Sequence, residues 1–237
     1  MMGRIKDFLE CSKYAFTETV KKLKRSYILF IFIVIRSMFE GMKGIVFFDQ
    51  SFESSLFSSL INYFIEITIL CFIAQSLRSI VLYNNTGKKS IENSISNFFY
   101  LVMSAVFCIY IMEFVINNLT QVLSPGLRIL ILFLFKIITS AFLELVYIEN
   151  VYGFSIIGES FRFVKNNILT WGVYAVIFTF IEGFLIKQIG LNVLNMSNEA
   201  IFIMLLALWD TLFLLFKGNL FKFLNKHSYR QRKFMRG

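Results

Sequence analysis

The chain has 237 residues, of which 57% are hydrophobic and 16% are charged, and its mean hydropathy is +0.68. A soluble protein of this size would have too little polar surface to cover so many apolar residues, so the composition excludes a soluble domain. The single histidine excludes a histidine-based metal site, and three cysteines without paired spacing argue against a disulfide framework.

Residues 1–25 are predicted to form an amphipathic helix on the cytoplasmic side of a membrane. Apolar residues recur there at near-helical spacing, with lysines on the other side, and they are Ile5, Phe8, Leu9, Phe16, Val20 and Leu23. We expect this helix to lie along the membrane and to lead directly into a membrane-spanning helix. The charge of this segment is unlike that of a cleavable signal peptide.

The apolar residues then fall in six blocks of about 20 residues, the length that a helix needs to cross about 30 Å of hydrocarbon. This pattern predicts an all-α fold, a single-domain bundle of six transmembrane helices. The predicted spans are residues 27–48, 57–80, 96–117, 127–150, 168–188 and 200–219. A second amphipathic helix is expected before the fifth span, where Phe154, Ile157, Phe161 and Val164 form an apolar stripe. Both amphipathic helices are predicted to be elbows at the cytoplasmic surface.

The distribution of positive charge predicts the orientation of the chain. Basic residues precede the first span, follow the second, separate the fourth from the fifth and follow the sixth, whereas the opposite side carries only Arg128 and Lys187. The positive-inside rule therefore places both termini in the cytoplasm, and we expect the inner membrane of a bacterium. The basic side chains expected at lipid headgroups are Lys21, Lys22, Lys24, Arg25 and, in the basic tail at 220–237, Arg230, Arg232 and Lys233.

Every predicted span carries an acidic residue, and an acid that faces hydrocarbon costs about 2.5–3.5 kcal/mol. The acids are Glu40, Glu66, Glu113, Glu144, Glu182 and Asp210, and the intramembrane bases are Arg36, Lys43 and Lys136. Helical spacing puts Arg36, Glu40 and Lys43 on one face of the first span. It likewise puts Glu144 on one face with Lys136. We expect all these side chains to face the interior of the bundle, where Arg36 is predicted to contact Asp210.

Three interpretations of this charged interior remain open at the level of sequence. Polar side chains hold transmembrane helices together, buried carboxyl groups handle protons or ions in transporters, and such groups also contact helices of partner proteins. Six acids outnumber three bases, so one-to-one pairing is impossible. The remaining acids must be protonated, share a proton or reach water.

The segment at 144–180 resembles an element of several bacterial six-helix membrane families. It contains the run Glu144-Leu-Val-Tyr-Ile-Glu149-Asn-Val-Tyr-Gly153, followed by Glu159-Ser160-Phe161-Arg162-Phe163-Val164-Lys165-Asn166-Asn167. One such family is the membrane domain that is attached to some glycerophosphodiester phosphodiesterases. The chain lacks the proline that usually precedes the acid and has no attached catalytic domain. The resemblance implies an all-helical membrane bundle and no particular activity.

No motif points to an enzyme, because the chain has no P-loop, no G-x-G-x-x-G, no H-E-x-x-H and no G-x-S-x-G. We expect a transport-type protein or a subunit of a transport complex, without a metal or other cofactor. The alternative is an accessory or scaffold protein that binds another membrane protein or lipid. The expected partners are the lipid bilayer and either another membrane protein or a second copy of the chain, and no nucleic acid is expected.

Overall fold

The structure, a computed structural model, describes residues 2–46, 52–181 and 196–234, with the side chains of residues 4–40, 59–181 and 203–234. Within these ranges all secondary structure is helical. The elements are α1 (Met2–Lys22), η1 (Leu23–Arg25), α2 (Tyr27–Val46), α3 (Phe52–Val81), η2 (Lys88–Asn93), α4 (Ser94–Leu119), α5 (Pro125–Ile138), α6 (Phe142–Glu144), η3 (Leu145–Glu149), α7 (Ser155–Asn166), η4 (Ile168–Gly172), α9 (Met196–Lys226) and α10 (Tyr229–Phe234). Residues 173–181 continue as a helix after η4.

Four helical segments are long and apolar enough to cross a membrane. They are Ser59–Val81, Lys88–Leu119, Pro125–Glu149 and Ile203–Lys226. A fifth is present if Ser155–Asn166 and Ile168–Ile181, which meet at an angle of 95°, form one bent span. The described part of the chain is therefore all-helical with four to five candidate spans. Six spans and two surface elbows stay predictions, and the end of the predicted span 168–188 lies outside the described residues.

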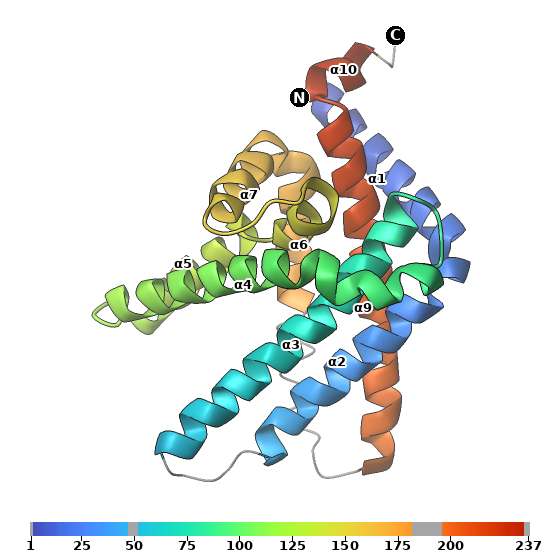
Figure 1. Cartoon of the computed structure of the whole chain (residues 1–237). Coiled ribbons are helices and arrows are strands. Elements are labelled where there is room, and N and C mark those ends of the chain that lie inside the picture. Colours follow the sequence, from blue (N-terminus) through green and yellow to red (C-terminus); the bar gives the residue numbers. More distant parts are fainter. Residues whose placement is uncertain (1, 47–51, 182–195, 235–237) are drawn as a thin grey trace.

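Helix α3 lies at the centre of the bundle. It packs against α2, α4, α9 and the turn η3, while α1 packs against α9. Figure 1 shows α4 crossing α3, with α5, α6 and α7 on the far side from α1. Many side chains of α3 are almost completely buried, among them Ile67, Leu70, Cys71, Ile73, Ala74, Leu77 and Ile80. This burial is confined to the C-terminal part of α3, since Leu60, Phe64 and Ile65 nearer its start are exposed.

The predicted span 127–150 is interrupted between α5 and α6. The Ser160 hydroxyl of α7 enters the interruption, where it donates to the Ile138 carbonyl at 2.6 Å and accepts from the Ala141 N–H at 3.3 Å. Ser160 is completely buried, so its two bonds satisfy backbone groups at a place where water is not available as a partner. The π-helical turn η3 follows α6 and ends at Asn150, whose φ of 56° is left-handed. The sequence predicted a continuous helix here, and this prediction is wrong at residues 139–141.

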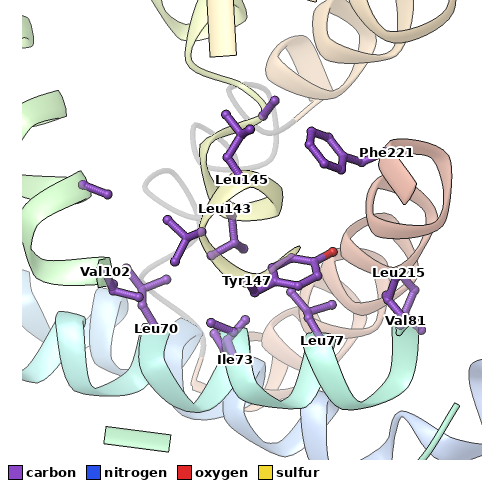
Figure 2. Close-up of a cluster of buried hydrophobic side chains, with 14 of the residues drawn as sticks. Leu70, Ile73, Leu77, Val81, Val102, Leu143, Leu145, Tyr147, Leu215 and Phe221 are labelled. Carbon is purple, nitrogen blue, oxygen red and sulfur yellow. The ribbon is translucent and has the colours of Figure 1, made fainter. Parts of the chain in front are cut away.

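Tyr147 of η3 is a large side chain in the centre of the core. Figure 2 shows its ring beside Leu77 of α3, with the hydroxyl directed toward α9. Tyr147 is completely buried and packs close to Gly218 of α9. A Cβ atom at Gly218 would overlap the Tyr147 hydroxyl and lie 2.9 Å from Val81 Cγ2. Only glycine at this position lets α9 approach both neighbours without a steric clash.

We predict that Gly218→Ala lowers the free energy of unfolding by about 1–3 kcal/mol, because the added methyl group overpacks this contact. The matched control is Gly158→Ala in α7, where a Cβ atom meets nothing within 4 Å. That control should raise stability by about 0.5–1 kcal/mol, because alanine favours a helix. Thermal unfolding in detergent micelles measures both effects. Equal changes in the stability of the two variants would contradict the close contact between Gly218 and Tyr147.

Helix α1 packs along α9 through small and polar residues. Asp7, Cys11, Ala15 and Thr19 are buried and four residues apart, so they form one stripe on the helix. The apolar stripe that the sequence indicated lies on another side of α1, where its members are exposed except for the half-buried Phe8. The exposed ones are Ile5, Leu9, Phe16, Val20 and Leu23. The described part of the chain therefore leaves most of the apolar stripe of α1 uncovered.

A buried ion pair joins the two ends of the described chain. Arg232 of α10 donates to both carboxylate oxygens of Asp7, from Nε at 3.0 Å and from the guanidinium NH2 at 3.1 Å. Both side chains are almost completely buried, and Figure 1 shows the two termini at the same end of the molecule. The assignment of Arg232 to lipid headgroups is therefore wrong, because its guanidinium group is held inside the protein.

We predict that Asp7→Asn and Arg232→Met each lower the free energy of unfolding by about 3–5 kcal/mol, because each leaves one charge buried without its counter-charge. Lys21→Gln is the control, since it removes the exposed ion pair with Glu18, and it should leave the melting temperature unchanged. Thermal unfolding in detergent micelles compares the three variants. Similar melting temperatures for all three would contradict a stabilising role for the buried pair.

Candidate functional site

A cavity of about 390 Å³ lies among α2, α3, α4, α5, α9 and the helix at 173–181. Five charged side chains from five helices are among the described residues that line it, and they are Arg36, Glu66, Glu113, Lys136 and Lys217. Four of these belong to the charged interior that the sequence predicted, and the structure brings them to one place. The volume falls within the range of about 300–1,000 Å³ that is usual for small-molecule sites.

Arg36 reaches the cavity from α2, where it forms an ion pair with Glu40. The Arg36 Nε and Glu40 Oε1 atoms are 3.0 Å apart, one helical turn along the chain. This is the pairing that the four-residue spacing indicated. The side chain of Lys43, which the sequence put on the same face, lies outside the described residues. Glu40 is exposed and does not line the cavity, whereas Arg36 does.

Glu66 of α3 and Glu113 of α4 supply the negative charge of the cavity. The Tyr110 hydroxyl donates to Glu66 Oε2 at 3.3 Å, and the Tyr63 hydroxyl donates to the Met103 carbonyl at 2.9 Å. These two bonds join α3 to α4, and the first also positions the Glu66 carboxylate at the cavity. Glu66 and Glu113 are each half-buried.

Lys217 of α9 was missed as an interior residue by the sequence interpretation, which counted it among the basic residues at the end of the sixth span. Its Nζ lies 3.4 Å from Glu144 Oε2 and donates to the Ser140 carbonyl at 2.8 Å. It also lies 5.5 Å from the ring centroid of Trp171, whose indole N–H donates to Ser140 Oγ. The continuing apolar residues after Lys217 were the signal that α9 extends further.

Glu144 is completely buried, and its ion-pair partner differs from the predicted one. The sequence placed Lys136 on the same stripe as Glu144. The helix is interrupted at residues 139–141, so the two side chains no longer follow one helical register. Lys217 takes the place of Lys136. Lys136 is exposed and lines the cavity, where it has no hydrogen bond or ion pair with any residue that the structure describes.

Two further acids were predicted for the charged interior, and they are Asp210 and Glu182. Asp210 is half-buried on α9 and is not among the described residues that line the cavity. Its contact with Arg36 stays a prediction. Glu182 lies outside the described residues. Among the residues that the structure describes, no three histidine, cysteine, aspartate or glutamate side chains lie together as a metal site would require.

The basic residues assigned to lipid headgroups divide into two groups. Those that are exposed or half-exposed are Lys21, Lys24, Arg25, Arg230 and Lys233. Lys22, by contrast, is buried between α1, α3 and α9, so its assignment to headgroups is wrong. Its Nζ donates to Asn219 Oδ1 at 2.6 Å and to the Val81 carbonyl at 3.2 Å. Lys222 donates to the same carbonyl at 2.9 Å, so two lysines stabilise the C-terminal end of α3.

A comparison with known protein families found no match, a search of curated proteins found no similar sequence, and a search of solved structures found no similar fold. The resemblance to the membrane domain of some glycerophosphodiester phosphodiesterases stays a prediction. The interpretation of the cavity therefore depends on its own geometry.

Burial, with the positive charge of Lys222 as a second cause, lowers the pKa of Lys22 to about 8. Between pH 8 and the ordinary lysine value of 10.5, the unfolded chain binds more protons than the folded chain at this residue, so stability increases with pH. We predict that the stability of the wild type relative to Lys22→Met increases by about 2 kcal/mol from about pH 8 to about pH 10. Thermal unfolding of both proteins across this range measures the difference, and a constant difference would contradict the lowered pKa.

Proposed function

We propose that this chain is a transport-type membrane protein, or a subunit of a transport complex, whose charged cavity binds a small ion or polar solute. The single observation that carries the proposal is the convergence of five charged side chains from five helices on one cavity. Charged groups within membrane helices are costly, and where they occur they mark ion and substrate pathways. Helix packing alone does not require a cavity of this size.

The charges that remain unpaired give the proposal its chemistry. Lys136 and Glu113 have no ion pair with any described residue, although both line the cavity. An ion or solute that enters the cavity can therefore interact with either charge without breaking an existing pair. Lys217 already interacts with Glu144, so it contributes a fixed charge at the wall.

The proposal includes an orientation in a bacterial inner membrane with both termini in the cytoplasm and six spans. The Asp7–Arg232 ion pair supports the placement of both termini on the same side, because a pair across the bilayer could not form. The concentration of lysine and arginine near these ends supports the cytoplasmic side. In this proposal helix α2 and the segment that contains Ile168–Ile181 are the two spans beyond the four candidates that are long and apolar enough by themselves.

A second candidate function is that of an accessory protein that binds another membrane protein or lipid. The pairing of Arg36 with Glu40 and of Lys217 with Glu144 favours it, because these charges then stabilise the bundle itself. In that case the protein itself carries no flux, so neutralising the unpaired cavity residues has no effect on transport.

Purified protein in liposomes tests the proposal with four probes, namely H⁺, Na⁺, K⁺ and Cl⁻. We expect the wild type to conduct at least one of them, and expect Glu66→Gln or Lys136→Gln to lower that flux at least tenfold, because each removes a charge that faces the cavity. The matched controls are Glu92→Gln and Lys88→Gln, which change exposed residues of η2, and these should retain the flux.

Flux equal to that of empty liposomes for all four ions would overturn ion transport. Full flux in both Glu66→Gln and Lys136→Gln would overturn the role of the cavity. Circular dichroism of each variant shows whether a lost flux comes from a lost fold.

A further inference from the structure

A second cavity, a groove of about 610 Å³, lies between α1, the helix at 173–181 and α9. One wall is aromatic and consists of Tyr174, Phe178, Trp209, Phe213 and Phe216. Its rings contact one another, since the centroids of Phe178 and Phe213 are 3.6 Å apart and those of Tyr174 and Phe216 are 4.7 Å apart. This wall is therefore a continuous apolar surface along two helices.

The opposite wall is the exposed apolar side of α1. Phe16 and Val20 line the groove, although 65% and 54% of their surfaces remain exposed. Both belong to the apolar stripe that α1 does not use for packing on α9. The groove is thus continuous with an apolar surface that the described part of the chain leaves uncovered, and a flexible apolar ligand would cover both.

The position of the groove decides which kind of apolar ligand reaches it. Trp209, Phe213 and Phe216 belong to the candidate span Ile203–Lys226, and where this helix crosses the membrane, lipid hydrocarbon lies beside this wall. An acyl chain therefore enters the groove from the bilayer without crossing water. Flat aromatic and aliphatic walls favour such a chain through dispersion contacts and exclusion from water.

Lys13 is the charged residue of the described groove lining. It is exposed and has no hydrogen bond or ion pair with the residues that the structure describes. Lys6 lies seven residues before Lys13, so helical geometry puts both lysines along one side of α1, next to the apolar stripe, and Lys24 follows in η1. A lysine at the edge of an apolar groove complements a negatively charged headgroup.

We propose that this groove binds an anionic phospholipid, with one acyl chain against the aromatic wall and the headgroup phosphate at Lys13. The site is separate from the charged cavity and does not depend on the transport proposal. In this proposal the exposed apolar side of α1 contacts lipid and does not contact a protein partner. It also distinguishes Lys13 from the other lysines of α1, which do not line the groove.

Quenching of tryptophan fluorescence by brominated lipids tests the proposal. Trp209 lines the groove and is 38% exposed, whereas Trp171 is buried at 1% exposure, so quenching reports on Trp209. In one sample brominated phosphatidylglycerol is diluted into phosphatidylcholine, and in the other brominated phosphatidylcholine is diluted into phosphatidylglycerol. The quenching in the two samples gives a relative binding constant for the two lipids. We expect the wild type to prefer phosphatidylglycerol about fivefold.

Lys13→Gln should abolish this preference, and Lys24→Gln is the matched control that should retain it. A second pair tests the apolar part of the site. Val20→Phe narrows the groove and should lower the preference, while Leu23→Phe changes the same exposed stripe outside the groove lining and should not. Neither Val20 nor Leu23 is buried, so all four variants are expected to fold.

Equal binding constants for the two lipids in the wild type would overturn the proposal and identify ordinary annular lipid contact. An unchanged preference in Lys13→Gln would also overturn it. Loss of quenching together with a dimer in size-exclusion chromatography would indicate that a second copy of the chain covers the groove instead.

Discussion

The ion pair between Lys217 and Glu144 links α9 to α6 in the interior of this protein. Glu144 is completely buried, and a charge in that position is tolerated only with a counter-charge nearby, which Lys217 supplies at 3.4 Å. The same lysine donates to the Ser140 carbonyl at the break between α5 and α6. One side chain of α9 therefore stabilises both a buried carboxylate and an interrupted helix. Because Lys217 also lines the cavity, a shift of α9 would change the cavity and the core together.

The class of the fold was readable from the sequence, because blocks of about 20 apolar residues match the length of a membrane-spanning helix and are rare in soluble domains. The interruption of the predicted span 127–150 was not readable. No proline or glycine lies at residues 138–142, and the break is stabilised by Ser160, which is 22 residues from Ile138. A tertiary contact of this kind leaves no local signal. The length of α9 was also underestimated, because charge ended the predicted span while apolar residues such as Phe221 and Leu224 continued to be buried.

Four of the five charged side chains of the candidate site were predicted from the sequence as interior residues, but their contacts were predictable only where these were local. Arg36 and Glu40 are one turn apart on one helix, so their pairing follows from spacing. Pairs between helices depend on how each helix is rotated, which composition does not specify. For this reason Lys22 and Arg232, each within a basic cluster, were assigned to headgroups although both are buried. Counting charges along the chain does not predict what an individual side chain contacts.

The packing of α1 against α9 has a consequence for the order in which the protein assembles. The buried polar groups of α1 contact residues much later in the chain, since Lys22 binds Asn219 across 197 positions and Asp7 binds Arg232 across 225. During synthesis these groups lack those partners until α9 and α10 have been made. Until then α1 can rest on the membrane through its apolar side, as other interfacial helices do. The contacts that join α1 to α9 and α10 can therefore form only after both of these helices have been made.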